Sequence, residues 1–138
     1  MTVEQALVNQ VRQRAGAICE YCRMPQQYDL LIFQIDHVIA RKHHGTDELE
    51  NLALACFACN NHKGPNIAGV DPNTGEIARL FHPRQDYWED HFKWHGAVLI
   101  GRTSIGRATI DVLAINLFHR VQLRLMLILE GVFPLPNS

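Results

Sequence analysis

The chain has 138 residues, of which 47% are hydrophobic, and its formal net charge is −1 with the histidines neutral. This length suits one domain of about 100–150 residues, and the apolar fraction excludes a disordered chain. A net charge near zero argues against a tight nonspecific nucleic-acid binder, which needs a broad basic field. It argues less against an enzyme that confines its basic residues to one cleft.

The sequence predicts neither a signal peptide nor a membrane span. The segment from Met1 to Gly16 lacks the apolar core of a signal peptide. The most apolar run, Leu125 to Leu129, is far shorter than the ~20 residues that cross a bilayer. We therefore expect a cytoplasmic protein in a reducing compartment, with no membrane partner. Paired cysteines there more often hold metal than form disulfides.

The first half of the chain alternates helical and extended patterns. A capping box opens the first helix, with Thr2 as the N-cap and Gln5 reaching back to it. Apolar periodicity, β-propensity and breaker residues predict a helix to about Arg14, a strand over 30–35, a loop over 41–50, a strand over 52–55 and a short helix over 59–63.

The second half reads as a hairpin followed by two helices. A strong turn signal over 71–75 separates two β-prone runs, 67–70 and 77–81. A further strand is expected over 97–100, followed by helices over 105–115 and 117–130. Asn116 is the candidate N-cap of the last helix. In the aromatic stretch between hairpin and helices, we expect Trp88 and Phe92 to be core residues.

All four cysteines fall into two Cys-x-x-Cys pairs, Cys19 with Cys22 and Cys56 with Cys59. Four thiolates complete the coordination of a closed structural Zn²⁺ site. The segment between the pairs is too small to bury enough apolar surface to hold itself together. A zinc staple is therefore physically expected.

Asp36 and His37 stand where the first predicted strand ends, facing the polar loop. Neighbouring residues on a strand point to opposite faces, so both can serve one site only where the strand bends or ends. With a hard divalent cation on the carboxylate, a neutral imidazole could deprotonate water for attack on phosphorus. This pattern is typical of a one-metal phosphodiesterase, although a lone histidine beside a strand is more often structural.

Asp36-His37, Asn51 and the run Cys56-x-x-Cys59-Asn60-x-x-Lys63-Gly64 resemble the HNH endonuclease family over roughly residues 16–66. The resemblance implies an α+β fold, in which a ββα-metal (His-Me finger) core is stapled by the four-cysteine zinc site. An N-terminal helix and a C-terminal extension (67–138), with a β-hairpin and two helices, would complete a single domain over 1–138.

The resemblance also implies roles for individual residues. His37 matches the general base that activates water, and Asp36 matches a ligand of the catalytic Mg²⁺ or Mn²⁺. Asn51 matches the residue that orients the loop and the base by hydrogen bonds. The family's last histidine usually follows the second cysteine pair directly, and Asn60 stands there instead.

An asparagine oxygen suits Mg²⁺, so Asn60 is our predicted third catalytic residue and metal ligand. His62 is the alternative. It lies three residues after Cys59 and so shares a helical face with a zinc ligand, whereas Asn60 and Lys63 share the neighbouring face.

Four basic residues are predicted to contact nucleic acid. Arg41 and Lys42 form, with His43 and His44, the densest basic cluster of the chain, which is either a solvated loop or a grip on phosphates beside the site. The other two predicted contacts are Lys63 and Arg84.

These observations predict a metal-dependent endonuclease that hydrolyses phosphodiester bonds of DNA, with double-stranded DNA as the expected partner. The alternative is a noncatalytic zinc-ribbon-like module that binds nucleic acid or protein. It accounts for the cysteines but leaves Asp36, His37 and Asn51 as coincidence. The broad apolar face of residues 117–129 indicates either a buried core helix or a homodimer interface.

Overall fold

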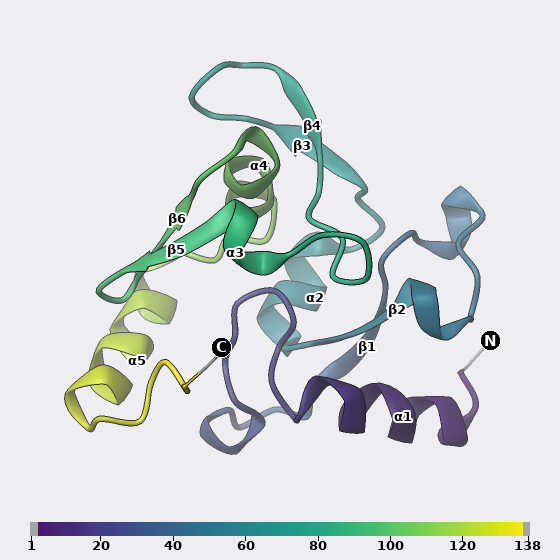
Figure 1. Ribbon diagram of the computed structural model, residues 1–138, viewed down its shortest axis with the longest axis horizontal. Coiled ribbons are helices and arrows are strands. Elements are labelled where there is room, and N and C mark those ends of the chain that lie inside the picture. Colours follow the sequence, from purple (N-terminus) through teal and green to yellow (C-terminus); the bar gives the residue numbers. More distant parts are fainter. Residues whose placement is uncertain (1–2, 137–138) are drawn as a thin grey trace. The chain divides into compact units, whose positions relative to one another are not determined.

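The computed structural model describes residues 3–136, and the chain divides into two compact units (Figure 1). Unit 1 comprises Met1–Ile67 and His82–Gln85, and unit 2 comprises Ala68–Phe81 and Asp86–Ser138. Helices and small antiparallel sheets build both units, which confirms the α+β class. That the two units form one domain stays a prediction. No helix among the described residues is long and apolar enough to cross a membrane.

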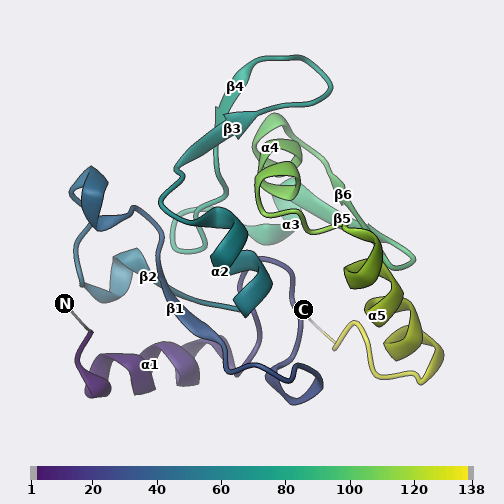
Figure 2. The same ribbon diagram turned by 180° about the vertical axis from the view of Figure 1, so that it is seen from behind.

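Unit 1 is built on one antiparallel strand pair, β1 (Gln34–His37) and β2 (Leu52–Ala55). All four residues of β2 are buried, because α1 (Gln5–Ala15) and α2 (Phe57–Lys63) pack against this strand. Figure 2 shows β1 and β2 side by side between these two helices. Short 3₁₀ helices lie in the connecting segments, at Gln26–Tyr28, Arg41–His43 and Leu49–Asn51.

The first strand begins later than predicted. The prediction placed it over 30–35, but β1 starts at Gln34, and the three apolar residues 30–32 are exposed. The Gln26 side chain donates to the Leu31 carbonyl and accepts from the Phe33 amide, at 3.0 and 2.7 Å, so these groups bond within a loop. The N-cap of α1 is Glu4, and the predicted cap, Thr2, lies outside the described residues.

Unit 2 contains the predicted hairpin, β3 (Ala68–Val70) with β4 (Ile77–Arg79), and a second pair, β5 (Phe92–His95) with β6 (Val98–Gly101). The sequence reading missed β5, which lies within the aromatic stretch. Trp88 and Phe92 are buried, as predicted. The helices are α3 (Trp88–His91), α4 (Ser104–Val112) and α5 (Phe118–Leu129).

One buried carboxylate fastens the hairpin of unit 2 to α4. Asp71, in the turn between β3 and β4, accepts hydrogen bonds from the Ser104 hydroxyl at 2.7 Å and from the Arg107 guanidinium at 2.8 and 2.9 Å. These bonds hold the pKa of Asp71 well below its usual value. The aspartate therefore stays charged and α4 stays against the hairpin, where it packs on β3 and β4.

The last helix, α5, has its polarity reversed relative to an ordinary surface helix. The Arg124 guanidinium is only 1% exposed and donates to the carbonyls of Ala97 and Ile115. Meanwhile Phe118 and Leu129 are 78% and 80% exposed. Within residues 118–129, which the structure describes in full, the apolar side chains therefore dominate the exposed face.

Asn116 does not act as the N-cap of α5. Its side chain accepts from the Leu99 amide at 3.0 Å and donates to the Leu99 carbonyl at 2.8 Å, so it satisfies both backbone polar groups of this β6 residue. Leu117 occupies the N-cap position instead.

Candidate metal centre and active-site pocket

The four cysteines form one buried cluster in unit 1. Their Sγ atoms all lie within 4.8 Å of one another, and those of Cys22 and Cys56 are 3.7 Å apart. Tetrahedral Zn²⁺ with bonds of about 2.3 Å places neighbouring sulfurs about 3.8 Å apart. A disulfide needs about 2.05 Å between its sulfur atoms. The donor set and its spacing therefore fit a structural zinc ion.

Within each cysteine pair, the backbone amide of the second cysteine lies near the sulfur of the first. The Cys22 amide points at Cys19 Sγ at 3.5 Å, and the Cys59 amide points at Cys56 Sγ at 3.4 Å. Cys56 is also the N-cap of α2. Burial raises the pKa of Cys59 well above its usual value, so without a metal this thiol keeps its proton. Zinc binding would displace such protons and thereby couple metal binding to folding.

A pocket of about 310 Å³ lies at the carboxyl end of β1. Three of its lining residues are the predicted acid, base and third ligand: Asp36, His37 and Asn60. The rival ligand, His62, is exposed and does not line it. The remaining lining residues are Ile35, Ala40, Arg41, Gly64 and Pro65.

Asp36 reaches the pocket from a buried position in the middle of β1. Its Oδ2 accepts a hydrogen bond from the Tyr21 hydroxyl at 2.6 Å, and its Oδ1 accepts one from the Lys63 ammonium at 3.2 Å. Burial raises the pKa of Asp36, while the positive charge of Lys63 and the bond from Tyr21 act in the opposite direction. Both partners thus favour the carboxylate, the form that a metal requires.

Two of the residues predicted to contact nucleic acid are held inside unit 1. Lys63 is 1% exposed, and its ammonium also donates to the His37 carbonyl at 3.1 Å. Arg84 forms an ion pair with Glu20, whose other oxygen accepts from the Leu54 amide at 2.8 Å. Burial lowers the pKa of Arg84 to about 10. These two cations serve internal ion pairs, so the structure gives no support to phosphate contacts by either of them.

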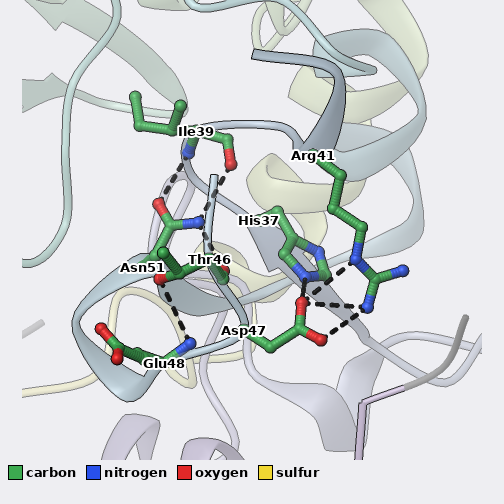
Figure 3. Close-up of polar contacts among 7 residues, drawn as sticks. All are labelled: His37, Ile39, Arg41, Thr46, Asp47, Glu48 and Asn51. Carbon is green, nitrogen blue, oxygen red and sulfur yellow. Dashed lines mark hydrogen bonds and ion pairs between the residues drawn. The ribbon is translucent and has the colours of Figure 1, made fainter. Parts of the chain in front are cut away.

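His37 has a carboxylate partner that the sequence did not indicate. Its Nε2 lies 2.7 Å from Asp47 Oδ1 (Figure 3). The Arg41 guanidinium binds the same carboxylate, at 3.0 and 3.1 Å from its two oxygens. Hydrogen bonds from His37 and Arg41 lower the pKa of Asp47. With Nε2–H donating to this carboxylate, the imidazole would carry its lone pair on Nδ1.

Asn51 holds the loop between His37 and Asp47 in shape (Figure 3). Its side-chain oxygen accepts from the Ile39 amide at 2.9 Å, and its nitrogen donates to the carbonyls of Ile39 and Thr46 at 3.0 and 2.8 Å. Gly45 permits this closure, because a Cβ there would lie 1.6 Å from the Ile39 oxygen.

Sequence reasoning missed two side chains that hold the pocket together, Asp47 and Tyr21. Asp47 lies in a segment that reads only as a polar loop, and Tyr21 reads as a spacer between two cysteines. The sequence does contain a clue to Asp47. Gly45, two residues before it, allows the loop to pass close to Ile39 and so return towards the end of β1. The sequence contains no comparable signal for Tyr21.

Residues 19–66 match the family model described as HNH endonuclease. The chain therefore contains an HNH domain. This confirms the predicted resemblance, and the match spans both cysteine pairs and the three pocket residues Asp36, His37 and Asn60. No curated protein and no solved structure is significantly similar to the chain. The HNH domain and its cysteine cluster indicate nuclease-type chemistry on nucleic acid, together with a zinc site.

We predict that Cys19→Ala removes bound zinc and unfolds unit 1, because three thiolates leave the structural site incomplete. Zinc content per chain and thermal unfolding by circular dichroism measure this. His62→Ala is the matched control, since His62 is an exposed potential ligand outside the cluster; that variant should retain its zinc. A Cys19→Ala protein that keeps one zinc and melts like the wild type would contradict the assignment.

Proposed function

We propose that the protein is a metal-dependent HNH endonuclease that hydrolyses phosphodiester bonds of double-stranded DNA. The observation that carries this proposal is the shared pocket, whose lining includes a residue with a buried carboxylate, one with an imidazole and one with an amide: Asp36, His37 and Asn60. A carboxylate and an amide oxygen form a hard donor set, which suits Mg²⁺ or Mn²⁺ better than softer metals. A cytoplasmic location, where DNA is accessible, belongs to the same proposal.

His37 is the general base in this mechanism. With Nε2–H donating to Asp47, its Nδ1 accepts a proton from water while the water oxygen forms a bond to phosphorus. The Asp47 carboxylate stabilises the imidazolium that results. The bond from phosphorus to the leaving oxygen then breaks. A cation bound by Asp36 and Asn60 would supply charge neutralisation at the phosphate and at that leaving oxygen.

Arg41 and Lys42 are the proposed contacts to the DNA backbone. Arg41 lines the pocket, and Lys42 is exposed on the same 3₁₀ helix, so both would lie near a scissile phosphate bound there. A local pair of cations is compatible with the near-neutral chain, because phosphate contacts position the substrate without reading its sequence.

A second copy of the chain is the proposed partner of α5. Its two charged side chains, Arg120 and Arg124, are buried, while Phe118, Met126 and Leu129 are largely exposed. Two such faces would meet without like-charge repulsion, as a two-fold symmetric interface requires. Each copy would contribute one pocket, and a dimer suits cleavage of both strands.

We predict that His37→Ala lowers the rate of Mg²⁺-dependent plasmid cleavage by about 100-fold or more, because it removes the general base. Conversion of supercoiled to nicked or linear plasmid measures the rate, and zinc content and melting temperature should stay at wild-type values. His62→Ala, an exposed histidine in the same unit, should cleave normally.

Two other outcomes of this assay would count against the proposal. Zinc-loaded wild type that does not cleave would favour the noncatalytic zinc-ribbon-like module that binds nucleic acid or protein. Equal cleavage by wild type and His37→Ala would remove His37 from the mechanism.

We predict that Asn60→Ala raises the Mg²⁺ concentration for half-maximal cleavage about tenfold or more, because it deletes an oxygen donor from the pocket. Zinc content should not change. A Mg²⁺ titration of the cleavage rate measures this, with His62→Ala as the comparison. A shift in His62→Ala and none in Asn60→Ala would reverse the assignment of the third ligand.

We predict that the wild type elutes as a dimer of its 15.7 kDa chain and that Met126→Glu with Leu129→Glu makes it a monomer. Two carboxylates on each copy would repel across the α5 face. Size-exclusion chromatography with light scattering measures the mass. Lys93→Glu, at an exposed position of β5, is the control and should remain dimeric. A monomeric wild type at high micromolar concentration would contradict this interface.

A further inference from the structure

Each of the two chain segments that carry a cysteine pair also carries a side chain that binds the carboxylate of Asp36. Tyr21 stands between Cys19 and Cys22 in the first pair. Lys63 lies one helical turn after Cys59, at the end of α2. Each side chain is almost completely enclosed, at 0% and 1% exposure, and each ends on Asp36.

The two contacts divide the carboxylate between them. The Tyr21 hydroxyl donates to Oδ2 at 2.6 Å, and the Lys63 ammonium donates to Oδ1 at 3.2 Å. A carboxylate with a separate buried donor on each oxygen has its rotation fixed. Lys63 adds a third anchor, because it also donates to the His37 carbonyl and so ties the end of β1 to α2.

Stability alone is a weak reason for this network. A buried ion pair is often no more stabilising than well-packed apolar residues of the same volume, because both charges lose their hydration. Asp36, however, is also one of the residues that line the pocket. Partners of a metal ligand outside the coordination sphere orient that ligand and commonly affect metal affinity.

We propose that Tyr21 and Lys63 are positioning residues that transmit the geometry of the four-cysteine site to Asp36. The inference rests on the proposed function, in which Asp36 binds the catalytic cation. One side chain comes from the turn at residues 19–22 and the other from α2 at residues 57–63, and the zinc ion would fix the bases of both. The structural site then determines where the catalytic carboxylate stands, in addition to holding the fold.

The test is a Mn²⁺ titration of zinc-loaded Tyr21→Phe. Binding is measured as paramagnetic broadening of the NMR signals of the His37 ring and the Asn60 side-chain amide. The substitution deletes one hydroxyl and keeps the ring that fills the core. We expect the half-broadening Mn²⁺ concentration to rise about tenfold or more, with one zinc per chain and a cooperative melt retained. Tyr28→Phe, in the same unit, is the matched control and should titrate like the wild type.

Wild-type titration by Tyr21→Phe would overturn the inference, as would loss of its zinc, since the hydroxyl would then serve the fold alone. A measurement on the unmutated protein provides an independent check. The Tyr21 hydroxyl proton is buried and hydrogen-bonded, so it should exchange slowly enough to be observed. Its signal should shift on Mg²⁺ addition with the same midpoint as the Asn60 amide. A hydroxyl signal that ignores Mg²⁺ while the amide responds would overturn the proposal.

Asp36→Asn separates this inference from the proposed function. If Asp36→Asn binds Mn²⁺ like the wild type, Asp36 is not a metal ligand and the proposed function itself is wrong. If Asp36→Asn binds Mn²⁺ more weakly while Tyr21→Phe does not, the ligand assignment stands and only the positioning role falls.

Discussion

The structure of unit 1 depends on four sulfur atoms gathered at one point. Its sheet consists of two strands of four residues each, and an isolated two-stranded sheet is at best marginally stable in water. The cysteine pairs stand 37 residues apart, counted from Cys19 to Cys56. A metal that joins them closes the segment containing both strands, and its binding free energy becomes folding free energy. With zinc bound, the sulfur cluster would supply stability that so small a core lacks.

Once the segment is closed, backbone hydrogen bonds place the polar groups. β1 pairs with β2 so that Asp36 faces Ala53 and His37 faces Leu52. Asn51 stands immediately before β2 and binds the loop that follows β1, through Ile39. The soft sulfur ligands and the harder nitrogen and oxygen donors thereby occupy separate places in one small unit. In the proposed function, this separation would let the chain select two different metals by ligand type.

The sequence was most informative where spacing itself carries chemistry. Two Cys-x-x-Cys pairs predict a metal site without knowledge of the fold, and the position of Asp36-His37 at a strand end indicates that both side chains can serve one site. The hairpin around residues 71–75 was equally readable, because its turn residues act locally. The predicted strand over 30–35 was less accurate, since the Gln26 side chain bonds the backbone there and shapes a loop.

Interactions between residues distant in sequence could not be predicted. Lys63 meets Asp36 across 27 positions and Arg84 meets Glu20 across 64, and neither pairing leaves a local pattern. From the sequence both cations were therefore predicted to contact nucleic acid, whereas in the fold Lys63 is buried and Arg84 is part-buried in its ion pair. The reversed polarity of α5 has the same origin, because the carbonyls that accept from Arg124 belong to Ala97 and Ile115. The sequence showed that this helix is rich in apolar residues, but only the tertiary structure determined which of its faces is buried.

Whether sulfur and oxygen donors hold two different metals is best tested by anomalous diffraction from crystals of the zinc-containing protein soaked in Mn²⁺. Data collected above and below the zinc and manganese absorption edges identify each metal by its position. We expect zinc among the four Sγ atoms and manganese in the pocket, within bonding distance of Asp36 and Asn60. Zinc in the cysteine cluster with manganese bound only elsewhere, for example at the exposed carboxylates near Glu48, would contradict this expectation.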